Sequence, residues 1–430
     1  MMARPSLRVM QPELLRLRMD PASSIEIARD TLALCGLVLA IGTLAAFLAQ
    51  RIRIPDVAIF LLAGIAIGPH GLGLVHVRAD SALNQVILLF GASYILFDGG
   101  ATIRLSILRQ VWVTLAVIAT LGVLITAAIV AAAAALVFKL PLIVALLLGS
   151  TLASTDPATL MPVFRQIRIR DRVAQTVMSE SAFNDAMAAI ITFTVLALAS
   201  GSGGFSPAHV LRDLVWQSVV GIVAGLALGY LAALLIAHER WALLAEYAPV
   251  VTLVAVIGAY FAASGLHASG FMAVFVFGVV LGNKESFGFK MQTGEAQKLA
   301  EFVLTTAFIM RLFIFMLLGT QVDFGLMSRY WLGGVTVVAV LMLIARPVTV
   351  FVCAGLDRRA RWNLAELLFM CWTRETGVIP AALAGLLLGM KAPGAEIIAS
   401  VTFVAILMTL LIQAPTTEWL GRKLGLLEEE

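Results

Sequence analysis

The stretch LLLGSTLASTDPATLMPVF, from Leu146 to Phe164, decides the fold of this chain. It is apolar at both ends, yet Asp156 and Pro157 stand near its centre among several Ser and Thr hydroxyls. Proline donates no backbone hydrogen bond and disfavours helix at the preceding residue, so we predict an interrupted helix here. A proline kink satisfied by Ser and Thr alone is the simpler alternative, but it does not explain Asp156. A broken helix exposes carbonyls and half-helix ends that can coordinate a cation.

The rest of the chain has the composition of a membrane protein. Of its 430 residues, 61% are hydrophobic and 13% are charged, and the mean hydropathy is +0.99, whereas soluble domains carry about 25% charged residues. Apolar runs of about 20 residues, the length that a helix needs to cross a bilayer, recur along the chain. The alternating pattern of a membrane β-barrel is absent. We therefore expect an all-α polytopic membrane protein with about 13 transmembrane helices. They are predicted near 27–49, 55–69, 83–97, 111–138, 141–164, 174–199, 213–237, 247–264, 268–282, 297–319, 330–354, 363–389 and 394–418.

Charges in the loops predict the orientation of these spans. Lys and Arg concentrate after odd-numbered spans, as in 165–172 and 358–361, and cytoplasmic loops carry such an excess. We expect a multi-pass protein of the cell inner (plasma) membrane, with the N-terminus outside and the C-terminus in the cytoplasm. Residues 1–26 are interpreted as an N-terminal extension without assigned function, 27–418 as a single membrane transport domain, and 419–430 as a short cytoplasmic tail.

The residue types indicate neither a cofactor nor a transition metal. Cys35, Cys353 and Cys371 stand far apart in apolar stretches, and the five histidines are scattered. None of them has the spacing of a zinc site. The chain has no GxxxxGK[ST] loop for a nucleotide phosphate, and its net charge of +4 is attributed to loops rather than to nucleic-acid binding.

The stretch MSESAFNDAMAAIITF, from Met178 to Phe193, places polar groups at the start of an apolar helix. Glu180 and Asn184 are one helical turn apart, as are Ser181 and Asp185, so the four share a face. A helix N-cap would explain the SES run, but Asp185 lies deeper. Because a charge within a span costs about 2.5–3.5 kcal/mol, we expect Asp185 to have a function.

Two further spans contain charges. Arg346 precedes a proline between long apolar runs, too far from either end to snorkel, so we expect it to pair with a buried carboxylate. The sequence TRETG interrupts 363–389 midway, where Arg374 and Glu375 either neutralise one another or reach other helices. The two interrupted spans run in opposite directions. Paired broken helices of this kind predict an inverted-repeat secondary transporter with its site near the membrane midplane.

Six motifs resemble, in order, those of the monovalent cation:proton antiporters of the NhaP type. They are ILFDGG (95–100), TDP (155–157), the ES and ND pairs (180–185), GFMAVFVFGVVLGN (270–283), IFMLLG (314–319) and ARP (345–347). The resemblance covers nearly the whole chain beyond residue 30. It implies inverted repeats with broken crossing helices at spans 5 and 12. It also implies a homodimer, in which a core domain (about 111–199 and 330–418) moves against a dimerisation or scaffold domain (about 27–97 and 213–319).

The same resemblance assigns roles to residues. Asp185 is implied to be the carboxylate that exchanges H⁺ for the cation, with Ser181, Thr155 and Glu180 also at the cation site. The implied supporting network comprises Asp156, Asn184, Arg346, Arg374 and Glu375, with Arg346 paired to Glu180. The family usually has glycine after the arginine of span 12, so Glu375 is a departure that bears on ion selectivity and on the charge moved per cycle.

The leading hypothesis is therefore a secondary transporter, not an enzyme, that exchanges Na⁺ or K⁺ for H⁺ by alternating access and serves pH homeostasis. Na⁺ is slightly favoured over K⁺. The Asn184–Asp185 pair is associated in the family with one-for-one, electroneutral exchange, because one carboxylate that binds either H⁺ or one cation moves no net charge. A cation channel or uniporter of the same fold, without proton coupling, is the alternative, and an inactive homologue or receptor is a third hypothesis. The expected partners are the cation, the proton, the lipid bilayer and a second copy of the chain, with no nucleic acid.

Overall fold

The computed structural model describes residues 21–52, 54–155, 169–199, 207–238 and 242–427. These residues form an all-helical structure, in which the only β feature is an isolated bridge between Ile169 and Leu427. The predicted all-α class is therefore confirmed for the described part of the chain.

The helices of the first half follow the predicted spans closely. A π-helical turn, Ile118–Gly122, joins α4 to α5 without a gap, while α4 itself is kinked at Val111. The helices are α1 (Pro21–Ile52), α2 (Asp56–Ile67), α3 (Ala82–Thr102), α4 (Leu105–Val117), α5 (Val123–Phe138), α6 (Leu142–Leu152) and α8 (Asp171–Ala199).

The helices of the second half include two continuous rods. The π-helical turns Leu341–Ala345 and Thr409–Gln413 join α13 to α14 and α17 to α18. Each turn is followed by a proline in the next helix, Pro347 or Pro415, which has no N–H for the helical ladder. The helices are α9 (Pro207–Ala237), α10 (Ala248–Gly265), α11 (Gly270–Gly282), α12 (Thr293–Thr320), α13 (Phe324–Val340), α14 (Arg346–Leu356), α15 (Leu364–Trp372), α16 (Val378–Gly389), α17 (Ala395–Met408) and α18 (Ala414–Lys423).

The membrane-spanning character of these helices varies with their length. Within the described residues, 9 helical stretches are long and apolar enough to cross a membrane, and α2, α6, α11 and α16 are shorter apolar helices of 10–17 residues. Every predicted span coincides with a helix, a continuous rod or a broken pair, except that residues 156–164 of the span predicted at 141–164 lie outside the described residues. The chain is thus a multi-pass membrane protein, while the count of thirteen spans stays a prediction.

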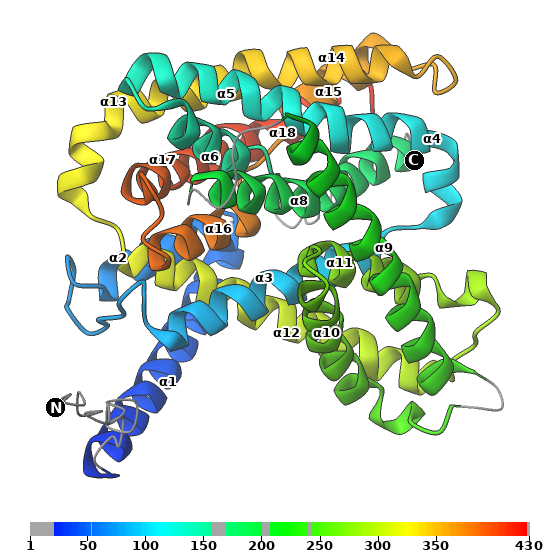
Figure 1. The fold of residues 1–430 in the computed structure, drawn as a ribbon, viewed down its shortest axis with the longest axis horizontal. Helices are drawn as coiled ribbons and strands as arrows, with labels where there is room; N and C mark the ends of the chain where they lie inside the picture. The colour runs from blue at the N-terminus through cyan, green and yellow to red at the C-terminus, as the bar shows by residue number, and fades with distance from the viewer. Residues whose placement is uncertain (1–20, 53, 156–168, 200–206, 239–241, 428–430) are drawn as a thin grey trace, which may run out of the picture.

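The helices gather into two groups in Figure 1. One group contains α4, α5, α6 and α8 together with α13 to α18, and the other contains α1 to α3 and α9 to α12. Within the first group, α16 borders the second, because it packs against α17 of its own group and against α3 and α12 of the other. The division into a moving core and a dimerisation domain follows this grouping but remains a prediction.

A glycine brings α6 close to α5 in the first group. A Cβ atom at Gly149 would overlap the carbonyl oxygen of Ala127, so only glycine permits this approach of the two backbones. On another side, α6 contacts α8, where the Thr192 hydroxyl donates to Ser150 Oγ over 3.0 Å. Helix α6 is therefore held between α5 and α8, with its last turn facing the polar part of α8.

Candidate functional site

Two helices end in the middle of the first group. Helix α6 ends at Leu152, and Ala153 to Thr155 continue without helical structure. Asp156, the residue that first indicated this break, lies outside the described residues. Residues 373–377 are not helical and separate α15 from α16, which confirms the predicted interruption of span 363–389.

The polar face of α8 meets the end of α6. The Ser154 hydroxyl donates a hydrogen bond to Oδ1 of Asp185, and Thr155 Oγ1 lies 2.7 Å from Ser181 Oγ. The Asn184 side chain makes two hydrogen bonds with Thr155. Its Nδ2 donates to Thr155 Oγ1 over 2.8 Å, and its Oδ1 accepts from the Thr155 backbone N–H over 3.2 Å. All five residues are buried. The helical spacing predicted from the sequence therefore does bring Ser181, Asn184 and Asp185 to one site.

The expected carboxylate partner of Arg346 is Glu180. Arg346 Nη1 and Nη2 donate to the two carboxylate oxygens of Glu180, with 2.8 Å between Nη2 and Oε2. Its third hydrogen bond runs from Nε to the carbonyl oxygen of Met370, 2.9 Å away in α15. Both charged side chains are at most 3% exposed. The pair thus joins α8, α14 and α15 in the interior.

The two charged residues of the break between α15 and α16, Arg374 and Glu375, are associated with the ends of different helices. Nη2 of Arg374 donates to the carbonyl oxygens of Leu152 and Ala153, each 2.9 Å away, where α6 leaves its last carbonyls without helical partners. Glu375 is buried and stands two residues before Gly377, the N-cap of α16. A cation at a helix C-terminus and an anion near an N-terminus are both stabilised by the helix dipole. Arg374 therefore reaches another helix, which is one of the two alternatives left open by the sequence.

The chain also resembles known proteins. Residues 36–423 match the family model described as sodium/hydrogen exchanger, transmembrane. The chain belongs to the sodium/hydrogen exchanger family. This family transports ions across membranes, so the predicted resemblance to cation:proton antiporters is confirmed.

Individual members of the sodium/hydrogen exchanger family resemble the chain over most of its length. It is 33% identical over 360 residues to Na⁺/H⁺ antiporter 1 of Methanocaldococcus jannaschii, covering 81% of each chain. It is 28% identical over 403 residues to the K⁺/H⁺ antiporter NhaP of Alkalimonas amylolytica, covering 91% of this chain and 67% of that protein. The solved structure of the sodium proton antiporter MjNhaP1 from M. jannaschii at pH 8 matches with a TM-score of 0.79 and 30% identity, covering 93% of this chain and 99% of the other. The fold is therefore that of this antiporter.

The buried cluster of this exchanger offers chemistry for a small cation. Asp185 supplies a carboxylate, and Ser154, Thr155 and Ser181 supply hydroxyl oxygens within hydrogen-bond reach of it or of one another. Oxygen donors of this kind suit hard cations. Among the described residues, no group of three or more His, Cys, Asp or Glu is arranged to hold a metal ion.

Ser154 is a member of the cluster that sequence reasoning did not select. It was one of several hydroxyls in 146–164, and nothing in the spacing distinguished it from its neighbours. Its contact with Asp185 exists because the helix ends at Leu152, so the next residues leave the helical path and turn toward α8.

A second polar cluster, also not selected from the sequence, fixes the start of α8. Asp357 Oδ2 accepts from Thr114 N (3.0 Å) and Thr114 Oγ1 (2.6 Å), and Trp362 Nε1 donates to the same hydroxyl over 2.9 Å. The guanidinium of Arg172, in the first turn of α8, stacks 4.2 Å from the Trp362 ring and donates to the Ala360 carbonyl. Burial alone raises the pKa of Asp357, but the hydrogen bonds from Thr114, Ala360 and Arg359 together hold this pKa below its ordinary value.

The end of the chain also contacts the start of α8. Arg170 N donates to the Leu426 carbonyl over 3.1 Å, and Arg170 Nη2 lies 3.3 Å from the Gly425 carbonyl oxygen. Leu426 is buried, and Leu427 forms the bridge with Ile169. The last described residues thus hold the two residues that precede α8.

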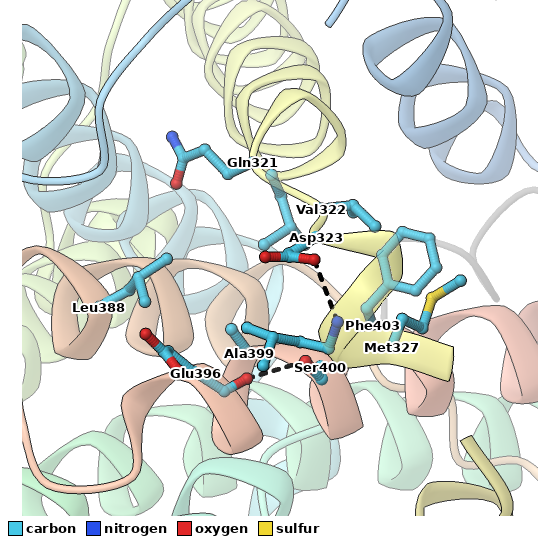
Figure 2. Close-up of a pocket in the computed structure, with 11 residues that line it drawn as sticks. Gln321, Val322, Asp323, Met327, Leu388, Glu396, Ala399, Ser400 and Phe403 are labelled. Atoms are coloured by element: carbon cyan, nitrogen blue, oxygen red, sulfur yellow. Dashed lines mark hydrogen bonds between the residues drawn. The ribbon is translucent and has the colours of Figure 1, made fainter. Parts of the chain in front are cut away.

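A separate pocket lies where α12 and α13 meet α16 and α17. Figure 2 shows Asp323 and Glu396 on opposite sides of it. The Asp323 carboxylate is used locally, because its Oδ1 accepts from the N–H groups of Gly325 and Leu326 and caps α13. None of the residues that line this pocket belongs to the buried cluster around Asp185, so we assign the pocket no part in the site.

Proposed function

We propose that this chain exchanges one monovalent cation for one H⁺ across the cell inner membrane, with Asp185 as the carboxylate that binds either ion. The observation that carries the proposal is the buried contact of Asp185 with the broken end of α6, in a member of the sodium/hydrogen exchanger family. The relatives named as Na⁺/H⁺ and K⁺/H⁺ antiporters support cation/proton antiport.

Asp185 holds the cation together with neutral oxygens. Ser181 and Thr155 contribute hydroxyls, whose 2.7 Å contact is replaced by two contacts to the ion when it enters. Glu180 lies one turn before Asn184 on the same helix face, and its charge is balanced by Arg346. Asn184 orients Thr155 through both ends of its amide. Asp156 keeps its predicted place in the supporting network.

One-for-one exchange follows from competition at a single carboxylate. Protonation of Asp185 removes the charge that attracts the cation, and cation binding disfavours the proton. A core that crosses with either H⁺ or one cation on Asp185 carries the same charge in both directions. The cycle is then electroneutral and is driven by the two ion gradients alone.

Movement of the core against the scaffold changes access to the site. We assign α4, α5, α6, α8 and α13 to α18 to the moving core, and α1 to α3 and α9 to α12 to the scaffold that dimerises. The C-terminus is placed in the cytoplasm, the N-terminus outside, and Na⁺ is preferred to K⁺, since the relative of higher identity is named for Na⁺.

Proton movement in proteoliposomes tests this function. With an imposed pH gradient, addition of Na⁺ or K⁺ is expected to move H⁺ in the opposite direction, and Asp185→Asn is expected to abolish the response. Asp213→Asn, at an exposed carboxylate of α9, is the matched control and should transport normally. Repetition with Li⁺, Na⁺ and K⁺ gives the selectivity, and absence of a charge signal on a solid-supported membrane tests electroneutrality.

Two results contradict the proposal in different ways. Full activity in Asp185→Asn removes the site assignment. Cation flux without proton movement identifies a uniporter or channel instead of an antiporter.

A further inference from the structure

The break between α15 and α16 lies beside α17 and α18, and two hydrogen bonds fix its register there. Trp372 Nε1 donates to Thr416 Oγ1 over 2.8 Å, and Thr376 N donates to Thr409 Oγ1 over 3.1 Å. Four residues of non-helical chain reach at most about 14 Å, and seven helical residues rise about 10 Å. Residues 373–375 therefore run alongside the helix face between Thr409 and Thr416.

Gln413 occupies the middle of that face. It stands four residues after Thr409 and three before Thr416, the spacing of side chains on one side of a helix. Gln413 is completely buried, and neither its Oε1 nor its Nε2 has a hydrogen-bond partner among the described residues. An unpartnered buried polar group costs about 1–3 kcal/mol, so this amide is expected to face a ligand.

The break segment, which the Thr376–Thr409 hydrogen bond holds against this helix face, carries further buried oxygen-bearing side chains. Thr376 is completely buried, and its Oγ1 has no hydrogen-bond partner among the described residues although its backbone N–H is used. Glu375, directly before it, is also completely buried and adds a carboxylate. Arg374 uses its Nη2 for the two carbonyl oxygens at the end of α6. The break and the facing helix thus offer a carboxylate, a hydroxyl and an amide carbonyl, all completely buried.

We infer that Glu375, Thr376 and Gln413 form a second site for a monovalent cation, distinct from the one at Asp185. Hard oxygen donors select an alkali cation over a transition metal, and a single carboxylate matches a single positive charge. The helix dipole of α16 stabilises the negative charge of Glu375, but it does nothing for the Gln413 amide. A bound cation would be stabilised by the Glu375 charge and would also take Gln413 Oε1 as a ligand.

A cation that stays bound at this second site does not change the number of ions moved per cycle. The break between α15 and α16 moves together with α8 if the core is rigid. An ion that stays bound beside Glu375 throughout the cycle leaves the one-for-one ratio at Asp185 unchanged. The inference rests on the proposed function for its choice of Na⁺ and K⁺ as ligands.

Counting bound ions tests the second site independently of transport. Purified protein is titrated with ²²Na⁺ and with ⁸⁶Rb⁺, the latter standing in for K⁺, in a scintillation proximity assay. The wild-type protein is expected to bind two ions of at least one kind, and Asp185→Asn one. Adding Gln413→Leu or Glu375→Gln to Asp185→Asn is expected to remove that remaining ion. Gln413→Glu, which keeps an oxygen ligand, should restore binding relative to Gln413→Leu.

Thr417→Val is the matched control for these variants. Thr417 lies in α18 next to Gln413 and is also completely buried, but its hydroxyl already donates to the backbone carbonyl of Gln413 over 2.9 Å. It should leave the ion count unchanged, and size-exclusion elution and melting temperature verify folding. The inference is overturned if Asp185→Asn binds neither isotope, or if its remaining ion survives both Gln413→Leu and Glu375→Gln. Transport by Asp185→Asn decides the proposed function separately, since an active Asp185→Asn contradicts that function whatever the ion count is.

Discussion

Arg346 and Glu180 face one another as a two-pronged ion pair in the interior, 166 residues apart in sequence. Both side chains are buried, and Nε of the guanidinium donates a further hydrogen bond to the Met370 carbonyl. Its members belong to α14 and α8, and its backbone acceptor belongs to α15. The pair therefore ties the helix that carries Asp185 to the first half of the broken pair α15 and α16.

Removal of one member of this pair is expected to be worse than removal of both. Arg346→Met or Glu180→Leu leaves an uncompensated buried charge, which costs about 3–5 kcal/mol, whereas replacing both with apolar residues is often neutral. We expect both single variants to melt at clearly lower temperature in detergent and the double variant to recover much of the loss. Equal losses that simply add would show that the two side chains do not stabilise each other.

Thr155 is expected to act on cation affinity more than on folding. Thr155→Val keeps the shape but removes the hydroxyl that contacts Ser181 and Asn184. Loss of one neutral hydrogen bond or ligand contact is worth about 1 kcal/mol, so the KM for the cation should rise about 5–10-fold. Thr155→Ser retains the hydroxyl and should stay near wild type. Unchanged cation KM in Thr155→Val would remove this residue from the site.

Transport is expected to require the guanidinium group of Arg374 and not only its positive charge. One Nη atom serves two carbonyls at the end of α6, and the planar guanidinium holds its donors in a fixed geometry that an ammonium lacks. Arg374→Lys should lose most transport, and Arg374→Met should also lose stability, because two buried carbonyls then lack a donor at about 1–3 kcal/mol each. Transport rate and melting temperature measured on the same preparations separate the two effects, and wild-type transport by Arg374→Lys would contradict the geometric requirement.

Asp357 gives the fold a defined dependence on acid. Its pKa in the folded protein is lowered, since hydrogen bonds from Thr114, Ala360 and Arg359 outweigh burial. The ionised Asp357 therefore stabilises the folded protein at pH values above about 3.9, the pKa of an aspartate in the unfolded chain. This contribution disappears as the pH falls through the lower pKa of Asp357 in the folded protein. We expect Asp357→Asn to be less stable than wild type at neutral pH, with the difference shrinking below about pH 4.

Melting temperatures measured across this pH range check the prediction for Asp357. Asp80 is the control, because its pKa is also lowered, chiefly by the hydrogen bond from Arg78, but at a surface site where solvent screens the interaction. Asp80→Asn should change stability little at any pH. A wild-type to Asp357→Asn difference that is constant with pH would mean that the charge of Asp357 is unimportant.

The contact between the chain end and the start of α8 is tested by two truncations. Removal of 424–430 deletes Leu426, whose burial contributes roughly 1.5–3 kcal/mol, and the carbonyls that bind Arg170. Removal of 428–430 deletes three glutamates and keeps these contacts. We expect the longer truncation to lower the melting temperature and the shorter one to leave it unchanged; equal effects would show that the contact is unimportant.

Several features of the fold can be predicted from individual residues of the sequence. Apolar length predicted the spans, and the charges and proline of 373–380 predicted the break before α16 because a continuous apolar helix cannot hold them without partners. The need of Arg346 for a buried carboxylate was likewise evident from its distance to both ends of the span. Each of these features depends on a residue and its neighbours in the sequence, so it can be recognised without the structure.

Other contacts depend on where a helix stops in space. Arg374 binds Leu152 and Ala153 because α6 ends there, and the sequence does not say which carbonyls remain without helical partners. The same is true of Ser154, which reaches Asp185 only because the chain leaves the helical path. The Thr114–Asp357 contact joins residues 243 positions apart, and neither residue type indicates the other.

The separation of Glu180 from Arg346 also has a consequence for how the protein is made. At a synthesis rate of about 5–20 residues per second, the 166 residues between them take roughly 8–33 s to emerge from the ribosome. Until then α8 has no arginine to balance Glu180, and a lone charge within a bilayer is costly. The ion pair can form only after α14 has been synthesised, so the contacts that join α8 to α14 and α15 are completed late in the biogenesis of this exchanger.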